Sequence, residues 1–286
     1  MLLASTAVLL LSTSAIADEI QKTTQTPATL KANFRRIGLE LSSTDVSHAK
    51  EYADSPVSEL SADGQTVVKG VFDFALEYNQ DNLRWNNSLF MEYAKTKLKP
   101  ADGPSTENED ADKILLSSEY AHKLWQVYNL DLGPMLNAEY QTEFTKNNDA
   151  PRQQILRAKG GLMLFNGNII KDLYIAGVGE YDMTYSQKVS KIAGEIGWRL
   201  EYDLRDGVKL STNGYYRDYF SYSNYVGTDL KYDLNLKARM DVAVWGNCAL
   251  GPYISYRQAK SREASVSGSN FQVGLSFSYN NLFDLL

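Results

Sequence analysis

Apolar and polar residues alternate along most of the chain after Phe34. In the last such segment, Phe271, Val273 and Leu275 alternate with Gln272 and Gly274. Successive side chains of a strand point to opposite faces, so this alternation predicts half-buried β-strands; an amphipathic helix would repeat every three to four residues. We find twelve such segments, with approximate bounds 34–43, 67–78, 83–95, 113–123, 126–141, 153–165, 171–185, 189–203, 207–220, 226–237, 240–257 and 270–279.

The lengths of these segments and of their connections narrow the architecture. Most segments exceed the ~5–6 residues of an ordinary strand and match the ~9–11 residues that cross a bilayer at a tilt. Long links follow the first, third, fifth and eleventh segments, whereas tight turns such as Asn166-Gly167-Asn168 follow the second, sixth and eighth. An even strand number with this alternation is typical of outer-membrane barrels. The sequence therefore predicts an all-β fold, a single antiparallel up-and-down transmembrane β-barrel of about 12 strands over residues 34–286.

The N-terminal residues have the pattern of an export signal. Residues 1–17 carry no charge, have an apolar centre and end in Ala15-Ile16-Ala17, with Asp18 next. An apolar run followed by small residues at this spacing predicts a signal peptide over 1–17, cleaved near Ala17. Residues 18–33 are then expected to form a periplasmic N-terminal segment. No Lys or Arg precedes the apolar run, so a buried N-terminal helix is the alternative.

Composition excludes several other classes of protein. The chain has 286 residues, a formal net charge of -6 and one cysteine, Cys248. A single cysteine excludes an internal disulfide framework, and the acidic balance argues against nucleic acid as a partner. The mean hydropathy of -0.37 and the absence of a long apolar run after Ala17 argue against membrane-spanning helices.

In a lipid-spanning barrel the apolar phase faces hydrocarbon and the polar phase faces the lumen. The polar phase of the predicted strands carries charges of both signs. Inside a barrel of about 12 strands these charges could pair and close the bore, or line a narrow aqueous path. The candidate lumen-lining residues are Lys69, Asp73, Glu92, Glu119, Glu180, Asp182, Glu195, Arg199, Glu201, Arg217, Asp229 and Lys231.

A search for catalytic or metal-binding motifs predicts neither. The two histidines, His48 in the first long loop and His122 at a short turn, lie outside any serine or aspartate arrangement suited to nucleophilic hydrolysis. There is no His/Cys cluster at metal-ligand spacing, and the acidic stretch 102–112 lacks the spacing of a calcium loop. We expect no enzyme activity, no metal and no cofactor.

The export signal, the alternating segments and the aromatic-rich last segment resemble Gram-negative outer-membrane β-barrel proteins of the porin-like class. Arg84-Trp85-Asn86-Asn87-Ser88-Leu89 and Gly160-Gly161-Leu162-Met163-Leu164-Phe165 resemble a family of uncharacterised outer-membrane barrels. The segment 271–279 resembles the C-terminal signal that the barrel assembly machinery reads, here followed by the tail 280–286. The resemblance implies the bacterial outer membrane, contact with its lipid and lipopolysaccharide, and a narrow channel for small polar solutes.

Two other functions fit the same pattern. A closed structural or surface-interaction barrel would carry no solute and would contact partners through its long loops. A soluble periplasmic β-barrel would bind an apolar ligand, with the alternation inverted so that Leu234 points inward. One internal echo, Leu132-Gly133-Pro134 and Leu250-Gly251-Pro252, predicts a bulge or bend in two strands, because proline cannot donate to a ladder.

Overall fold

The computed structural model describes residues 27–52, 54–55, 57–61, 66–98, 106–146 and 151–286. The expected signal peptide over 1–17 and residues 18–26 of the expected periplasmic segment lie outside the described residues. Within the described residues, twelve long antiparallel strands close into one barrel. They are β1 (Thr29–Ser47), β2 (Thr66–Gln80), β3 (Leu83–Leu98), β4 (Thr106–His122), β6 (Leu130–Thr142), β7 (Gln154–Phe165), β8 (Ile170–Asp182), β9 (Val189–Arg205), β10 (Val208–Tyr222), β11 (Leu230–Trp245), β12 (Cys248–Ser261) and β13 (Gly268–Asp284).

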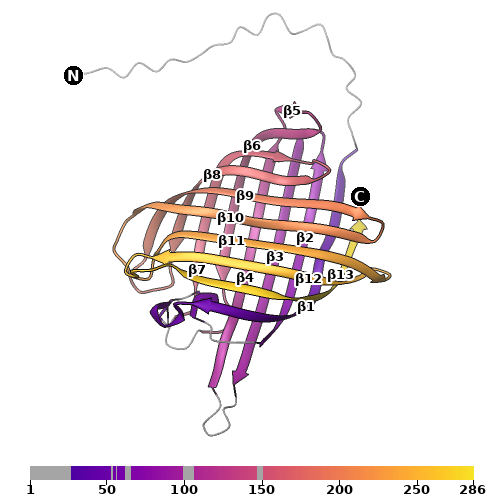
Figure 1. Ribbon diagram of the computed structural model, residues 1–286. Coiled ribbons are helices and arrows are strands. Elements are labelled where there is room, and N and C mark those ends of the chain that lie inside the picture. Colours follow the sequence, from indigo (N-terminus) through magenta and orange to yellow (C-terminus); the bar gives the residue numbers. More distant parts are fainter. Residues whose placement is uncertain (1–26, 53, 56, 62–65, 99–105, 147–150) are drawn as a thin grey trace, which may run out of the picture.

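Each long strand pairs with its neighbours in sequence, and two further pairings close the ring. β1 pairs with β13, and β4 pairs with β6. The three-residue strand β5 (Trp125–Val127) pairs only with the start of β6 and stands outside the ring. In Figure 1 the nearer strands cross the farther ones steeply, as the tilt of a closed barrel requires. The predicted fold class is therefore confirmed.

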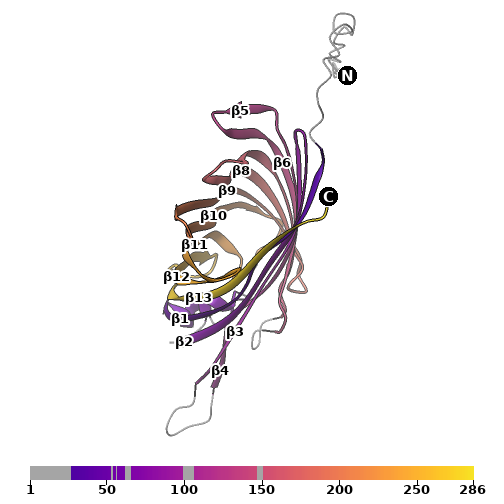
Figure 2. The same ribbon diagram turned by 90° about the vertical axis from the view of Figure 1, so that its right-hand side faces the viewer.

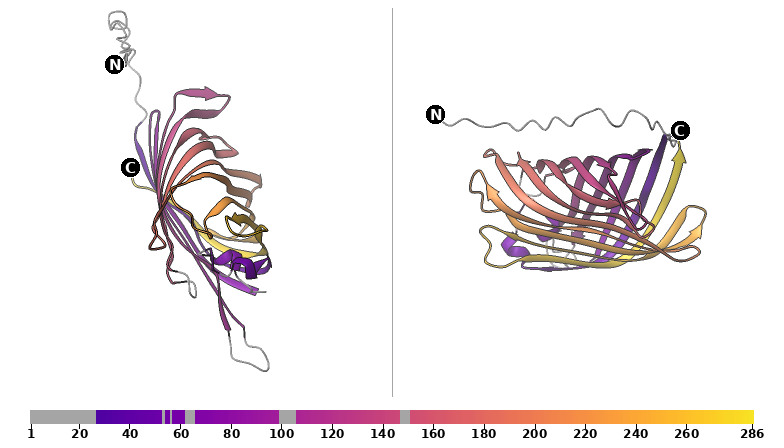
Figure 3. Two further views of the ribbon diagram at one scale, coloured as in Figure 1. Left: turned by 90° about the vertical axis from the view of Figure 1, so that its left-hand side faces the viewer. Right: turned by 90° about the horizontal axis from the view of Figure 1, so that it is seen from above.

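The wall begins earlier and ends later than the alternation indicated. β1 starts at Thr29, so residues 29–33 belong to the barrel and not to a separate periplasmic segment. The tail after Tyr279 continues β13, where Lys31 is in register with Asp284. The ring of Phe283 packs against Phe34 at 6.0 Å between centroids. The start of β1 therefore pairs with the end of β13, and these two segments lie side by side in Figures 2 and 3.

The predicted boundary between the tenth and eleventh segments is wrong. The break expected near residue 238 lies inside β11, and the chain turns instead at Gly246-Asn247. Gly246 has a φ of 52°, a left-handed backbone conformation that glycine adopts without steric cost. The alternation of apolar and polar residues continues past residue 238 to the end of β11. The glycine at position 246, and not a break in the alternation, therefore marks the turn.

Short and long connections segregate to opposite ends of the barrel, as predicted. The links at 81–82, 166–169, 206–207 and 246–247 are short, and they share the end of the barrel where β1 begins and β13 ends. The connection between β1 and β2, at the other end, contains η1 (Ala49–Tyr52) and α1 (Ser58–Ser61). Among the described residues, no helix is long and apolar enough to cross a membrane.

The two faces of the wall differ in chemistry, and they settle which way the apolar residues point. Leu39 is 60% exposed on the outside, whereas its neighbour Glu40 is fully buried inside. Leu41, Leu275 and Phe277 are likewise exposed on the outer surface. An apolar outer face and a charged interior are the arrangement of a lipid-spanning barrel. The inverted arrangement, with Leu234 and its phase packed in a dry centre, is therefore wrong.

The repeated Leu-Gly-Pro segments share one backbone role. A Cβ on Gly133 would lie 1.7 Å from the carbonyl oxygen of His122, and a Cβ on Gly251 would lie 1.7 Å from that of Met240. Next to these glycines, the ladder between β6 and β4 stops at Met135, and the ladder between β12 and β11 lacks pairs at 251–252. Pro134 and Pro252 therefore lie where the ladder to β4 or to β11 is interrupted, so the missing backbone N–H of proline costs no hydrogen bond to that strand.

The outer apolar face yields a first prediction. Leu39→Arg places a charge in hydrocarbon near the middle of β1 and should lower the free energy of unfolding by about 2–4 kcal/mol. The measurement is denaturant unfolding of the barrel refolded into lipid vesicles. Gln187→Arg, in an exposed loop, is the matched control and should change stability by less than about 0.5 kcal/mol. Equal losses for the two variants would contradict the membrane-facing assignment.

Candidate functional site

The interior between β6 and β10 is filled by a network of buried ion pairs, here called the central network. Glu195 of β9 is 2% exposed. Its carboxylate accepts hydrogen bonds from Lys159 Nζ at 2.7 Å, Tyr174 Oη at 2.6 Å and Arg217 Nε at 2.5 Å. Charges removed from water are tolerated only when they are paired in this way. Glu195 of β9 therefore ties together β7, β8 and β10, which lie close to β9 in the wall.

A second carboxylate extends the central network toward the long-loop end. Glu180 of β8 accepts from Arg157 Nε at 2.6 Å and from Tyr219 Oη at 2.8 Å. Its other oxygen lies 3.1 Å from Lys191 Nζ. Arg217 Nη1 approaches the same carboxylate at 3.7 Å, so the two acids share this cation. Every charge named in the central network thus has an opposite partner.

A separate cluster gathers around Glu40 on the opposite wall. Lys237 Nζ of β11 lies 2.6 Å from Glu40 Oε1, and Lys69 Nζ of β2 lies 3.1 Å from Oε2. Arg36 also pairs with this carboxylate, and it donates to Ser276 Oγ at 2.8 Å. Lys69 has a second partner, Glu92, at 3.4 Å. The cluster is called the Glu40 cluster below.

A third group of charges bridges strands that are not neighbours. Arg84 of β3 lies 2.8 Å from Glu119 and 2.7 Å from Asp172 of β8. Arg199 Nε donates to the other oxygen of Asp172 at 2.7 Å. Because β3 and β8 are separated in the sheet order, this bridge crosses the lumen.

Between these groups the interior holds a cavity of about 700 Å³. Its walls include residues beside the short turns, such as Val208 and Ala243, and reach up to Glu59 of α1. Charged residues of both signs line it, among them Lys69, Asp73, Glu92, Glu119, Arg199 and Glu201. A polar hollow of this size has room for water and for small solutes.

The β1–β2 connection folds inward and bounds this cavity at the long-loop end. Tyr52, Val57 and Leu60 are buried against Ala259 of β12. Glu59 accepts from Arg257 Nη1 at 2.6 Å, and its backbone carbonyl accepts from Asn270 Nδ2 at 2.6 Å. An apolar anchor and a charged one together hold the segment inside the barrel.

Beside this segment lies a much smaller cavity of about 40 Å³, lined by Glu180, Asp182 and Asp229. Asp229 precedes β11, outside the strands, and burial raises the pKa of its carboxyl. Lys191, whose Nζ lies 2.6 Å away, acts in the opposite direction on this pKa. The cavity has space for about one or two water molecules.

The structure brings eleven of the twelve candidate lumen residues to the interior. Six line the larger cavity and three line the smaller, while Glu195 and Arg217 are packed between them. Lys231 is the exception: it is exposed, at a register shift between Leu230 and Tyr232. The extra residue of this bulge reverses the phase, so Leu230 packs inward against Val178 and Ala193 and Lys231 points away.

Several interior residues escaped the candidate set. They are Arg36, Arg84, Arg157, Lys159, Tyr174, Lys237 and Arg257, which all take part in the contacts above. Each of them occupies a position that the alternation assigns to the inner face of its strand. The alternation could therefore have identified them as interior residues.

The two histidines lie apart from the charged groups described above. His48 Nδ1 is 3.0 Å from the carbonyl oxygen of Ser267 in the long-loop region, and the ring of His122 stacks on Tyr120. Among the residues that the structure describes, no group of three or more His, Cys, Asp or Glu is placed to hold a metal ion.

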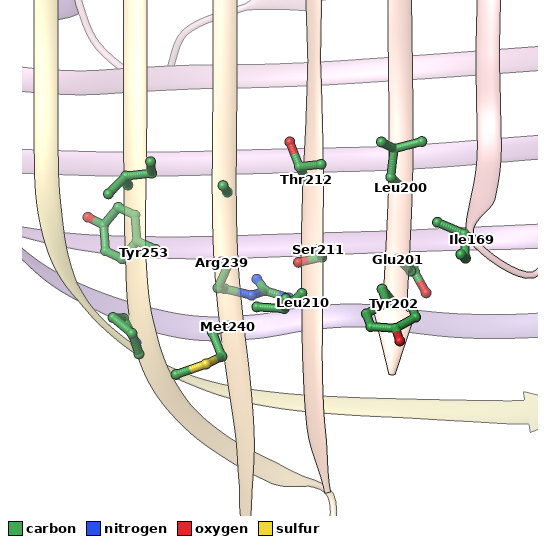
Figure 4. A pocket seen from close by; sticks show the side chains of 13 residues that line it. Ile169, Leu200, Glu201, Tyr202, Leu210, Ser211, Thr212, Arg239, Met240 and Tyr253 are labelled. Atoms are coloured by element: carbon green, nitrogen blue, oxygen red, sulfur yellow. The ribbon is translucent and has the colours of Figure 1, made fainter. Parts of the chain in front are cut away.

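A hollow of about 480 Å³ lies on the lipid-facing side of the wall (Figure 4). Leu200, Tyr202, Leu210, Met240 and Ile254 flank it, from strands β9 to β12. Smaller side chains such as Ala238 and Thr212 form its floor, and the lining is almost entirely apolar. In a bilayer such a hollow is filled by hydrocarbon.

The profile of one family, described as a protein of unknown function (DUF3078), matches residues 61–148. No curated protein sequence matches the chain.

The chain is loosely similar to solved barrels. The NanC porin has a TM-score of 0.44 at 9% identity, covering 84% of this chain and 98% of its own. An outer membrane channel from Pseudomonas putida has 0.45 at 10% identity, covering 90% and 97%. The outer membrane phospholipase A from Escherichia coli has 0.43 at 13% identity, covering 84% and 89%. A porin, a channel and an enzyme have nearly the same TM-score to this chain, so the structural similarity assigns no activity to it.

The central network yields a second prediction. Arg217→Met leaves Glu195 and Glu180 without a shared cation and should lower the free energy of unfolding by about 3–5 kcal/mol, because an uncompensated buried charge remains. Denaturant unfolding in lipid vesicles measures the loss. Arg205→Met, at the exposed end of β9, is the control and should cost less than about 1 kcal/mol. A loss no larger than the control's would show that the pairs are solvated and the network open.

Proposed function

We propose that the protein is a narrow outer-membrane channel for small polar solutes. The supporting observation is the cavity of about 700 Å³ inside the wall, lined by charges of both signs. A lipid-spanning barrel that served only as a scaffold would have no need of such a hollow, whereas a polar path is what a small solute requires to cross. We further propose that the barrel contacts lipid and lipopolysaccharide, depends on the assembly machinery for insertion, and catalyses no reaction.

In this proposal the β1–β2 connection is the restriction of the path. Glu59 borders the cavity, and the same side chain is held by Arg257, which also pairs with Asp233 through Nη2 at 2.9 Å. Solutes entering from the long-loop end meet this segment before they reach the cavity. The segment lies outside the strand ladder of the wall, so its displacement would widen the path without breaking the barrel.

A closed barrel is the second candidate, favoured by the central network. Its paired charges fill the lumen between β6 and β10, and the network alone leaves no passage there. The two candidates therefore differ on whether the remaining half of the lumen conducts.

The third prediction separates these candidates. The refolded barrel, inserted into a planar lipid bilayer in symmetric KCl, should produce discrete conductance steps, because the polar cavity supports an ion path. A detergent preparation without protein is the control. If the inserted barrel never produces a step, the channel proposal fails and the closed barrel replaces it.

The fourth prediction tests the restriction. Glu59→Gln removes the charge that Arg257 holds and should raise the time spent in open states several-fold in the same bilayer recording. Glu51→Gln lies in the same connection, but its side chain is exposed, so it should leave the recording unchanged. Identical recordings for both variants would remove the β1–β2 connection from the path.

A further inference from the structure

We propose that the Glu40 cluster, where it borders the cavity of about 700 Å³, is a binding site for small organic anions that carry a carboxylate. This proposal names the class of solute that the path would select. As a solute site it rests on the proposed channel function. The proposal rests on three cations, Arg36, Lys69 and Lys237, that contact the single carboxylate of Glu40 and also line the larger cavity.

The charges of this wall do not balance. Arg36, Lys69 and Lys237 all contact Glu40, and Lys69 also reaches Glu92. Three cations thus share two carboxylates, which leaves one positive charge in surplus. Arg239 and Asp241 stand beside them as a neutral pair at 2.7 Å. The central network has no such surplus. Four cations, Lys159, Arg217, Arg157 and Lys191, meet five carboxylates there, those of Glu139, Glu180, Glu195, Asp182 and Asp229.

The surplus faces the cavity. Arg36, Lys69, Lys237 and Arg239 all line it, whereas Glu40 does not and is fully buried behind them. Arg36 is 5% exposed, and among the described residues its Nε has no hydrogen-bond partner. Lys113, from β4, adds another cation to the same lining. A buried guanidinium with a free donor and a net positive surround favour an anion in the hollow.

Several carboxylates that line the cavity elsewhere already have cationic partners. Glu59 is paired with Arg257, and Glu201 lies 3.6 Å from Lys209. Glu119 and Asp172 are held by Arg84 at 2.8 and 2.7 Å. Asp73 is in register with Arg36 on the neighbouring strand, yet no ion pair joins these two described side chains. At Glu119 and Asp172 a cation would compete with Arg84, whereas an anion beside the Glu40 cluster would meet the Nε of Arg36.

The lining also indicates the size and chemistry of the ligand. Arginine and lysine donors bind carboxylates through charge-assisted hydrogen bonds. Asn235, Ser255 and Gln272 line the same hollow and supply neutral polar groups. A cavity of about 700 Å³ accommodates an organic acid of a few carbons with part of its water.

The experiment measures binding without conduction. The full-length barrel, refolded in neutral detergent micelles at low salt, is titrated by calorimetry with succinate and, separately, with the uncharged succinamide. Succinate should bind and succinamide should not, because only the former meets the surplus charge. Lys237→Met should weaken succinate binding about tenfold, which corresponds to about 1.4 kcal/mol, and Lys237→Arg should retain it.

Lys231→Met is the matched control, because it removes the same charge from the exposed bulge, and it should leave succinate binding unchanged. Absence of succinate binding, equal binding of succinamide, or an equal loss in Lys231→Met would each overturn the proposal. Loss of fold in Lys237→Met is detected by circular dichroism, and Lys113→Met then provides the second test of the same wall, with the same expected weakening.

The outcome is distinguishable from failure of the channel proposal. Succinate binding in a barrel that never conducts would keep the anion site and remove the channel. Conductance steps together with no succinate binding would keep the channel and remove the anion site.

Discussion

The interior of this barrel depends on one constraint: a charge placed inside a closed wall must find an opposite charge there. Lipid on the outside forces the apolar phase of every strand outward, so the polar phase has nowhere to go but the lumen. The charges that result cannot all be solvated in a ring of twelve strands. Glu180, Glu195 and Glu40 are each surrounded by two or more cations for this reason, and the shape of the hollow follows from where these pairs form.

The alternation of apolar and polar residues alone predicts most of this architecture. The phase that placed Leu39 outside and Glu40 inside follows from the geometry of a single strand, and the twelve segments correspond one to one with the long strands. Lys231 was misplaced because one bulged residue reverses the phase, and nothing in the local pattern marks that bulge. The boundary at Gly246 was missed because alternation runs on through both strands up to the turn.

The partners of the charges could not be predicted in the same way. Arg84 meets Asp172, and Lys237 meets Glu40, from strands that are distant in sequence and separated in the sheet. Such contacts depend on how far the closed sheet is sheared and flattened, which is a property of the whole ring and not of any segment. The inward fold of the β1–β2 connection depends on the same ring, because Tyr52 and Glu59 find their partners on β12 and β13.

The same constraint explains why one half of the lumen is filled and the other is hollow. Where acids and bases bond to one another, as around Glu195 and Glu180, only the small cavity beside Glu180 remains. Where cations exceed acids, as around Glu40, complete pairing within the protein is impossible, and the surplus is less costly beside water or a bound anion than in a dry interior. The hollow thus borders the part of the wall where cations exceed acids.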